Sequence, residues 1–261
     1  MKVRAPAKLN LVLRVGPVRS DGYHQVSTLM QAIDLCDEIE LERAAETTLE
    51  GFPGDTLVRA ALEALGETRA VHITKRIPVA AGLGGGSSDA GAVLRALGIG
   101  RTANELHELA RAIGSDVPFF LSGCETAMGT GRGDRIHALP DFPRDHAFLL
   151  VPSEPGLSAA EVYARARPNE VFPAVHGELV RRVHTARTPS DVAAMLVNEL
   201  QPAVLELRPE LAATLDAVRG AGALAAAVSG SGPTVFGVFG DRAAAERAAG
   251  LVPGSIPASP I

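Results

Sequence analysis

The chain has 261 residues, of which 46% are hydrophobic, and a net charge of -5. This length fits one large domain or two modest ones. The acidic balance provides no general basic field, so we expect neither nucleic acid nor a membrane as a partner. Cys36 and Cys124 fit neither a disulfide framework nor a paired metal motif, and charges interrupt the N-terminal apolar segment, so we expect a cytoplasmic protein without a signal peptide.

The N-terminal half alternates strand and helix patterns. In chain order we expect strands at 3–15 and 26–42, a turn at 16–22, a helix at 56–65, a strand from 71 to Pro78, and helices at 89–97 and 104–113. A segment rich in proline and charge, 139–146, suggests a domain boundary. We therefore divide the chain into domains 1–143 and 144–261.

The C-terminal half continues the same mixture. We expect a strand at 147–151, helices near 158–166, 173–185, 190–199 and 208–220, a strand pair within 225–239, a helix at 241–250, and a loosely ordered tail. The pattern predicts the α+β class for both halves.

A glycine-rich loop follows the strand that ends near Pro78. Four glycines within five positions remove β-carbons, which lets backbone N–H groups approach phosphate oxygens. We expect Ser87, Ser88 and Asp89 to cap the following helix, and a serine hydroxyl to be available to Mg²⁺. We predict that this loop binds the phosphates of ATP through Pro78, Val79, Ala80, Ala81, Gly82, Leu83, Gly84, Gly85, Gly86, Ser87 and Ser88.

The loop differs from two familiar phosphate-binding motifs. No Gly-Lys-Ser/Thr follows at the spacing of a Walker A motif, and Ser87 and Asp89 stand where GxGxxG needs its last glycine. Protein-kinase signatures are also absent. The alternative interpretation is a plain flexible turn between strand and helix.

Three segments together resemble the motifs of the GHMP kinases. They are PAKLNLVLRV at the N-terminus, PVAAGLGGGSSDA at 78–90 and VSGSGPTVF at 228–236. RSDGYHQVSTLMQAIDLCDEIEL, GSDVPFFLSG and NELQP are similar to the family within this superfamily that phosphorylates 4-diphosphocytidyl-2-C-methyl-D-erythritol. Glu199 and Asp134 are small departures from that family's pattern.

The resemblance implies both a fold and a reaction. The fold is the two-domain GHMP kinase fold, with a ribosomal S5 domain 2-like N-terminal domain and a ferredoxin-like C-terminal domain. The reaction is transfer of the γ-phosphoryl group of ATP, with Mg²⁺, to the 2-hydroxyl of a cytidyl-diphosphate substrate in the non-mevalonate isoprenoid pathway. We expect a monomer or a weak homodimer, and we predict no metal site made of protein ligands alone.

Two charged residues are the candidate catalytic groups. Asp116, in GSDVP, is the candidate general base, and Lys8 is the cation that orients it or steadies the transferred group. Each also has a structural interpretation, Lys8 as a solvated strand residue and Asp116 as a cap or turn carboxylate. Their place in motifs resembling those of the family favours function.

Four further residues are candidates for substrate binding. Asn10 lies on the same strand face as Lys8, where it either holds substrate or makes a structural hydrogen bond. The resemblance implies that Tyr23 stacks on cytosine, that His24 binds its edge and that Tyr163 is the second aromatic. Packing at a domain interface is the alternative for Tyr163. SGSGP at 229–233 is either part of the site or an ordinary hairpin turn.

Three other functions remain open from the residues alone. One is a homoserine, mevalonate or sugar kinase of the same superfamily. Another is a catalytically silent nucleotide-binding regulator, which the pairing of Lys8 with Asp116 disfavours. The third is a nucleic-acid-binding module, which the acidic charge disfavours.

Overall fold

A long antiparallel hairpin forms the backbone of the N-terminal half. The computed structural model describes residues 1–261. Strands β1 (Lys2–Val18) and β2 (His24–Arg43) pair along nearly their whole length, and Gly22 turns the chain between them with φ of 83°. The sheet continues as β3-β4-β2-β1-β8, and β5 and β6 extend it from β2. Its other strands are β3 (Thr48–Glu50), β4 (Arg69–Thr74), β5 (Thr126–Thr130), β6 (Arg135–Ala138) and β8 (Val197–Asn198).

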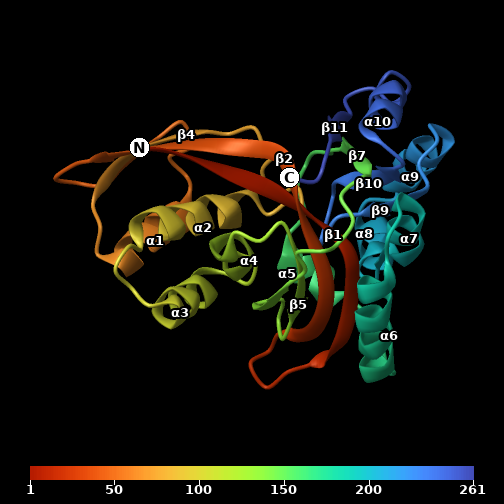
Figure 1. The fold of residues 1–261 in the computed structure, drawn as a ribbon, viewed down its shortest axis with the longest axis horizontal. Helices are drawn as coiled ribbons and strands as arrows, with labels where there is room; N and C mark the ends of the chain where they lie inside the picture. The colour runs from red at the N-terminus through yellow and green to blue at the C-terminus, as the bar shows by residue number, and fades with distance from the viewer.

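Four helices lie on one side of these long strands (Figure 1). They are α1 (Thr56–Leu65), α2 (Gly85–Leu97), α3 (Ala103–Ile113) and α4 (Val117–Ser122). In α1 the apolar residues Val58, Ala61, Leu62 and Leu65 recur at helical spacing and are buried against the sheet. Asp55 caps the start of α1, and the sheet and helices enclose one apolar core.

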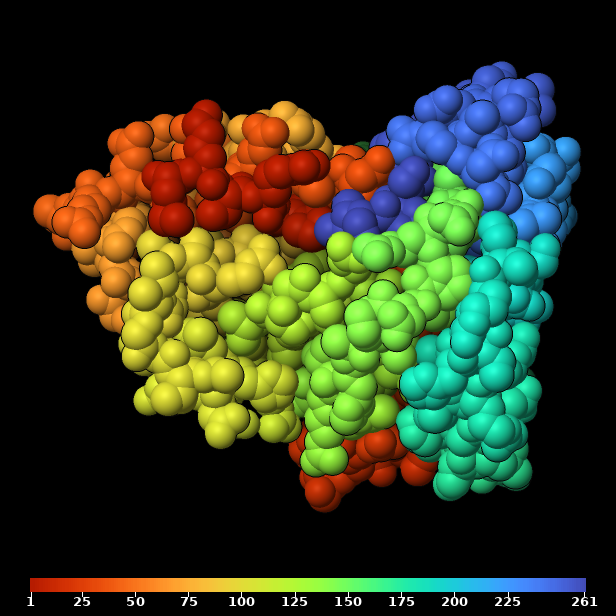
Figure 2. Space-filling model, viewed as in Figure 1, coloured from red at the N-terminus to blue at the C-terminus, as the bar shows by residue number.

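The C-terminal half is built on a second, smaller antiparallel sheet. Its strand order is β11-β7-β10-β9, and helices pack around it. Figure 2 shows this half, coloured green to blue, beside the N-terminal half, coloured red to yellow-green. Its elements are β7 (Ala147–Val151), α5 (Ala159–Ala164), α6 (Phe172–Thr185), α7 (Pro189–Met195), α8 (Gln201–Leu207), α9 (Leu211–Gly220), β9 (Ala225–Val228), β10 (Val235–Phe239), α10 (Arg242–Ala249) and β11 (Ile256–Ala258).

The two halves share contacts across the boundary predicted from the sequence. Strand β8 pairs in parallel with β1, and one core cluster contains both Leu9 and Phe236. The division at 143 and 144 falls between β6 and β7 and stays a prediction. None of the helices combines the length and the hydropathy that crossing a bilayer would require.

Most predicted elements are present, and several are displaced. The helix expected from Asp89 begins at Gly85, and the helix expected to 199 ends at Met195 because 197–198 joins the first sheet. The tail is not loose, since 256–258 pairs with β7. Strands β5 and β6 and helices α4 and α8 were not predicted, because short elements give too few residues for a period to appear.

A buried charge cluster fastens α2 to the sheet. Lys75, directly after β4, contacts Asp37 of β2 and donates to Asp89 of α2 at 2.7 Å. Both carboxylates are fully buried, and Asp37 also accepts from the backbone N–H groups of Arg76 and Ile77. Burial raises the pKa of Asp89 to about 7, although the charge of Lys75 opposes the shift. One ammonium thus serves two carboxylates, and burial favours the protonated form of Asp89.

The cluster generates a prediction for stability against pH. Between about pH 4 and 7 the folded protein binds more protons at Asp89 than the unfolded chain, so its contribution to stability is full below that range and falls as the pH rises through it. Asp89→Asn abolishes this titration. In wild type, the titration of Asp89 should lower the free energy of unfolding by on the order of 1–2 kcal/mol between pH 5.5 and 8, and this decrease should be absent in the variant. Urea unfolding at several pH values measures it. Asp216→Asn, at an exposed pair, is the control, and an unchanged pH slope in Asp89→Asn would contradict the assignment.

Close packing of α2 on α4 gives a second prediction. A β-carbon on Gly91 would lie 2.6 Å from Cβ of Phe120 and 3.0 Å from the backbone nitrogen of Leu121. Gly91→Ala should therefore lower the free energy of unfolding by about 1–3 kcal/mol. Gly177→Ala is the matched control, because Gly177 lies inside α6 with open space around it. This substitution should raise the free energy of unfolding by about 0.5–1 kcal/mol. Equal effects of the two substitutions in urea unfolding would refute the packing argument.

Candidate functional site

The glycine loop lies between β4 and α2 and approaches the C-terminal half closely. Gly82 has φ of 77°, and a β-carbon there would lie 2.3 Å from the carbonyl oxygen of Ser229. Helix α2 begins at Gly85, and its N-cap is Gly84, which offers no side chain to the first turn. The free N–H groups of that turn and the positive end of the helix dipole together favour an anion.

The expected capping by serine is wrong. Ser87, Ser88 and Asp89 all lie inside α2, because the helix already starts within the glycine run. The hydroxyl of Ser88 is fully buried and donates to the carbonyl of Pro6 at 2.6 Å, so it ties α2 to β1 and does not line the cavity beside the loop. Ser87 is the serine that lines the cavity beside the loop.

Lys8 connects the candidate base to the glycine loop. Its ammonium lies 3.4 Å from Oδ2 of Asp116 and donates to Oδ1 of Asn10 at 2.5 Å and to the carbonyl of Gly82 at 3.2 Å. The Lys8 side chain is 4% exposed and that of Asp116 is 32% exposed. The cation is therefore fixed and nearly dry, whereas the carboxylate opens toward solvent, where an acceptor hydroxyl can reach it.

Asn10 is engaged at both ends of its amide. Besides accepting from Lys8, it donates through Nδ2 to the hydroxyl of Thr28 at 2.8 Å. Its backbone N–H donates to the hydroxyl of Ser229 at 3.4 Å. One amide proton of Asn10 is left for a ligand, so its structural contacts do not exclude a contact with substrate.

The SGSGP segment connects β9 to β10 and packs on the glycine loop. The hydroxyl of Ser229 donates to the carbonyl oxygen of Gly82 at 3.0 Å, and the N–H of Thr234 donates to the carbonyl oxygen of Ala81 at 3.2 Å. Asn198, from NELQP, donates to the carbonyls of Val228 and Gly230, both at 2.8 Å. The turn between β9 and β10 thus packs directly on the glycine loop.

A second cavity, of about 530 Å³, gathers the predicted aromatic residues. Tyr23, His24 and Tyr163 all line it, together with Ser115 and Arg132. The His24 and Tyr163 rings stack with centroids 5.7 Å apart, and Nδ1 of His24 lies 3.0 Å from the carbonyl of Gly16. A carbonyl only accepts, so Nδ1 carries a proton and Nε2 is the ring nitrogen that can accept from a ligand.

Arg132 is a member of this cavity that the sequence did not reveal. Its guanidinium lies 5.1 Å from the centroid of the Tyr23 ring and donates to Asp134 at 3.1 Å. Asp134 also accepts from Arg111 at 2.9 Å. Burial acts to raise the pKa of Asp134, but the hydrogen bonds from the two arginines outweigh it and keep that pKa below its usual value. Asp134 therefore stays charged and holds Arg132 against the aromatic ring.

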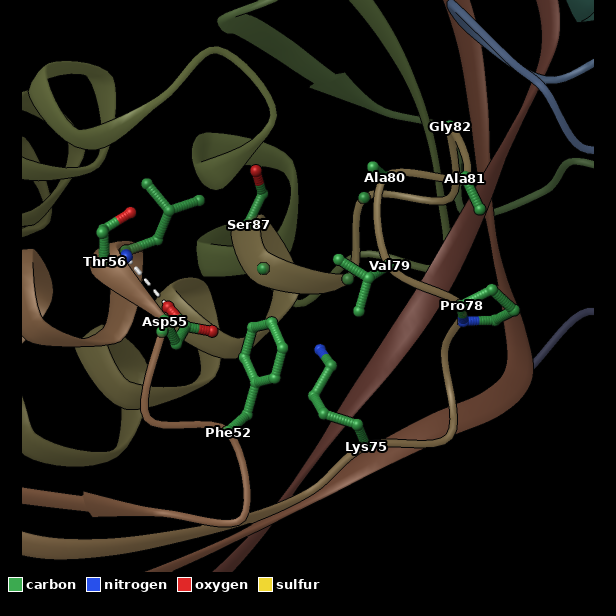
Figure 3. A pocket seen from close by; sticks show the side chains of 15 residues that line it. Phe52, Asp55, Thr56, Lys75, Pro78, Val79, Ala80, Ala81, Gly82 and Ser87 are labelled. Carbon is green, nitrogen blue, oxygen red and sulfur yellow. Dashed lines mark hydrogen bonds between the residues drawn. The ribbon is translucent and has the colours of Figure 1, made fainter. Parts of the chain in front are cut away.

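The cavity beside the glycine loop has a volume of about 360 Å³ (Figure 3). Its wall opposite the loop is formed by Phe52, Asp55, Leu57 and Lys75, none of which was predicted. Phe52, Asp55 and Leu57 lie at the start of α1, far from the loop in sequence, whereas Lys75 directly follows β4 and precedes the loop by a few residues. The one available signal was that Lys75 is among only three lysines in the chain.

Family comparisons agree with the resemblance seen in the sequence. Residues 55–124 match the GHMP kinases N terminal domain, and residues 181–250 match the GHMP kinases C terminal family. In the solved structures, a homoserine kinase from Cytophaga hutchinsonii has a TM-score of 0.72 at 19% identity, covering 99% of this chain and 94% of that chain. That likeness supports the two-domain GHMP kinase fold.

Closer relatives share one name, 4-diphosphocytidyl-2-C-methyl-D-erythritol kinase. The protein from Salinispora tropica is 41% identical over 95% of this chain and 86% of its own, and that from Pelobacter propionicus is 39% identical over 98% and 95%. A crystal structure of 4-(cytidine 5'-diphospho)-2C-methyl-D-erythritol kinase has a TM-score of 0.77 at 33% identity, covering 99% of this chain and 98% of that chain. The chain therefore belongs to the 4-diphosphocytidyl-2-C-methyl-D-erythritol kinase family of the GHMP kinases.

Proposed function

We propose that the protein transfers the γ-phosphoryl group of ATP to the 2-hydroxyl of 4-diphosphocytidyl-2-C-methyl-D-erythritol, giving the 2-phosphate and ADP in the non-mevalonate isoprenoid pathway. The observation that carries the proposal is the Lys8–Asp116 pair at 3.4 Å, whose ammonium also touches the glycine loop. Ser115, next to Asp116, lines the aromatic cavity. The pair thus stands between a phosphate-binding loop and a cavity suited to a base.

The proposed chemistry forms one bond and breaks one. The substrate oxygen bonds to the γ-phosphorus, the bond from that phosphorus to the bridging oxygen of ADP breaks, and the hydroxyl proton passes to Asp116. Lys8 holds the carboxylate in place and adds positive charge near the transferred group. Whether Asp116 removes the proton or mainly orients the hydroxyl is decided by the kinetics of its variants.

Mg²⁺ belongs to the proposal as a companion of ATP. The protein has no group of three or more acidic, cysteine or histidine side chains that would hold a metal by itself. This fits an ion that keeps waters and binds mostly to substrate phosphates, with one or two protein oxygens. The Ser87 hydroxyl is the protein oxygen that we assign to it, and the ion would neutralise phosphate charge.

The aromatic cavity is the proposed cytidyl site. Tyr23 is 51% exposed, so a face of its ring is available for stacking, and Arg132 steadies the ring. The acceptor Nε2 of His24 suits the exocyclic amino group of cytosine. Tyr163 packs beside His24 and closes the cavity. A monomer or weak homodimer, a cytoplasmic location and the absence of nucleic-acid binding stay predictions.

The direct test is ADP formation from ATP by the purified protein with Mg²⁺ and 4-diphosphocytidyl-2-C-methyl-D-erythritol. We expect turnover with this acceptor and competition by CMP or CDP. Turnover with homoserine, mevalonate or a simple sugar, with no effect of CMP, would replace the proposal by another GHMP kinase activity. ATP binding without turnover of any acceptor would favour a silent regulator.

Asp116→Asn tests the base. The amide cannot accept the hydroxyl proton, so we expect kcat to fall by roughly 100- to 10,000-fold while ATP affinity stays nearly unchanged. Steady-state kinetics and ATP calorimetry measure the two quantities. Asp141→Asn, on an exposed loop, is the matched control and should behave as wild type. Near-wild-type turnover in Asp116→Asn would refute its role as base.

Tyr23→Ala tests the cytidyl site. Loss of stacking should raise KM for the cytidyl substrate by about 5- to 150-fold and change KM for ATP far less. Tyr23→Phe keeps the ring and serves as the control, with both constants near wild type. If the alanine variant changes the two constants equally, Tyr23 is structural.

A further inference from the structure

A buried threonine on β2 contacts the strand that carries Lys8. Thr28 is 2% exposed, and its hydroxyl donates to the carbonyl of Val12 at 2.8 Å while it accepts from Nδ2 of Asn10 at 2.8 Å. Thr28 lines neither the aromatic cavity nor the cavity beside the glycine loop. It therefore reaches the candidate site only through the residues that it contacts.

The pairing of β1 with β2 brings Thr28 to the face of the sheet that carries Asn10. Asn10 pairs with Met30, and Thr28 lies two residues from Met30 along β2, so the three side chains share one face. In a regular ladder Val12 would lie opposite Thr28. It pairs with Leu29 instead, because β1 has one extra residue here. Bulges of this kind redirect side chains next to functional sites, and this one lies between Asn10 and the carbonyl that Thr28 uses.

The hydrogen bonds of Thr28 decide which way the amide of Asn10 faces. A carbonyl only accepts, so the single hydroxyl proton of Thr28 goes to Val12, and its oxygen accepts from Asn10. The amide nitrogen of Asn10 therefore faces Thr28, and the amide oxygen faces the ammonium of Lys8. A reversed amide would set its N–H groups against those of Lys8, and neither group could accept.

The amide oxygen of Asn10 is one of three oxygens around the ammonium of Lys8. The other two are Oδ2 of Asp116 at 3.4 Å and the carbonyl oxygen of Gly82 at 3.2 Å. An ammonium has three protons, so these oxygens match its donors. Without the oxygen of Asn10, one proton of a nearly dry cation would have no acceptor, and the ammonium would leave its place between the candidate base and the glycine loop.

We propose that Thr28 is a positioning residue for the phosphoryl transfer, whose hydroxyl orients the amide of Asn10 and thereby holds the ammonium of Lys8. The inference rests on the proposed function, because it takes Lys8 and Asp116 as the groups that act on the acceptor hydroxyl and the transferred phosphoryl group. Displacement of Lys8 harms the step in which charge develops more than it harms nucleotide binding, since other residues line the two cavities.

Thr28→Val keeps the shape of the side chain and removes its hydroxyl. We expect kcat with ATP and 4-diphosphocytidyl-2-C-methyl-D-erythritol to fall by roughly 5- to 100-fold, because the amide of Asn10 loses its buried acceptor. KM for either substrate should stay nearly unchanged. Thr28→Ser keeps the hydroxyl and should restore kcat to near the wild-type value. Steady-state kinetics with each substrate varied in turn measures these constants.

Thr126→Val is the matched control. Thr126 is also a buried strand threonine, 3% exposed, and its hydroxyl accepts from Nε2 of Gln31 at 3.2 Å. Gln31 pairs with Leu9, whose side chain points to the face opposite Asn10. The variant loses the same kind of hydrogen bond, yet its kcat should stay near wild type, and urea unfolding checks that both valine variants are folded. An equal fall of kcat in Thr126→Val would indicate general loosening of the sheet and would overturn the inference.

A double-mutant cycle tests whether Thr28 acts through Asn10. In an Asn10→Ala background the amide is gone, so Thr28→Val should lower kcat little further. Multiplied effects of the two substitutions would mean that Thr28 acts by another route, which contradicts the inference. Wild-type kcat in Thr28→Val would also overturn it and leave the proposed function in place. Failure of the wild-type protein to form ADP with any acceptor would overturn the proposed function itself.

Discussion

The ammonium group of Lys8 joins the parts of the molecule on which the proposed chemistry depends. It contacts the carboxylate of Asp116 from the segment before α4, the amide of Asn10 on its own strand and the carbonyl of Gly82 in the glycine loop. A charge that is nearly removed from water is tolerated only with such partners. The same requirement fixes the distance between the loop and the candidate base, so loss of the cation would disturb the glycine loop and the position of Asp116 together.

The glycine loop is held from two other directions. From the end of β4, Lys75 binds the buried carboxylates of Asp37 and Asp89 and so fixes the first turns of α2. From the C-terminal half, Ser229 donates to the carbonyl of Gly82. A chain with so many glycines has much conformational freedom to lose, and these contacts hold it in one arrangement before a nucleotide arrives.

Two cavities flank this centre and differ in chemical character. The cavity with Tyr23, His24 and Tyr163 offers aromatic faces and an acceptor nitrogen. The cavity with Phe52 and Asp55 offers an apolar wall and an unpaired carboxylate oxygen. The Lys8–Asp116 pair lies between them, because Lys8 contacts Gly82 in the lining of one cavity and Asp116 is next to Ser115 in the lining of the other. The proposed enzyme needs this arrangement because both its substrates are nucleotides.

The sequence by itself determined the GHMP kinase family, the α+β class and the segments that carry the candidate chemistry. Glycine spacing and short motifs are local, and they keep their meaning before the chain folds. The tertiary structure decided where α2 begins, because Lys75 and Pro6 engage Asp89 and Ser88 from other strands and leave neither free to cap it. It also decided that Asp55 lines the cavity beside the glycine loop and that the tail joins the second sheet. These features depend on contacts between residues far apart in the chain, which local patterns do not encode.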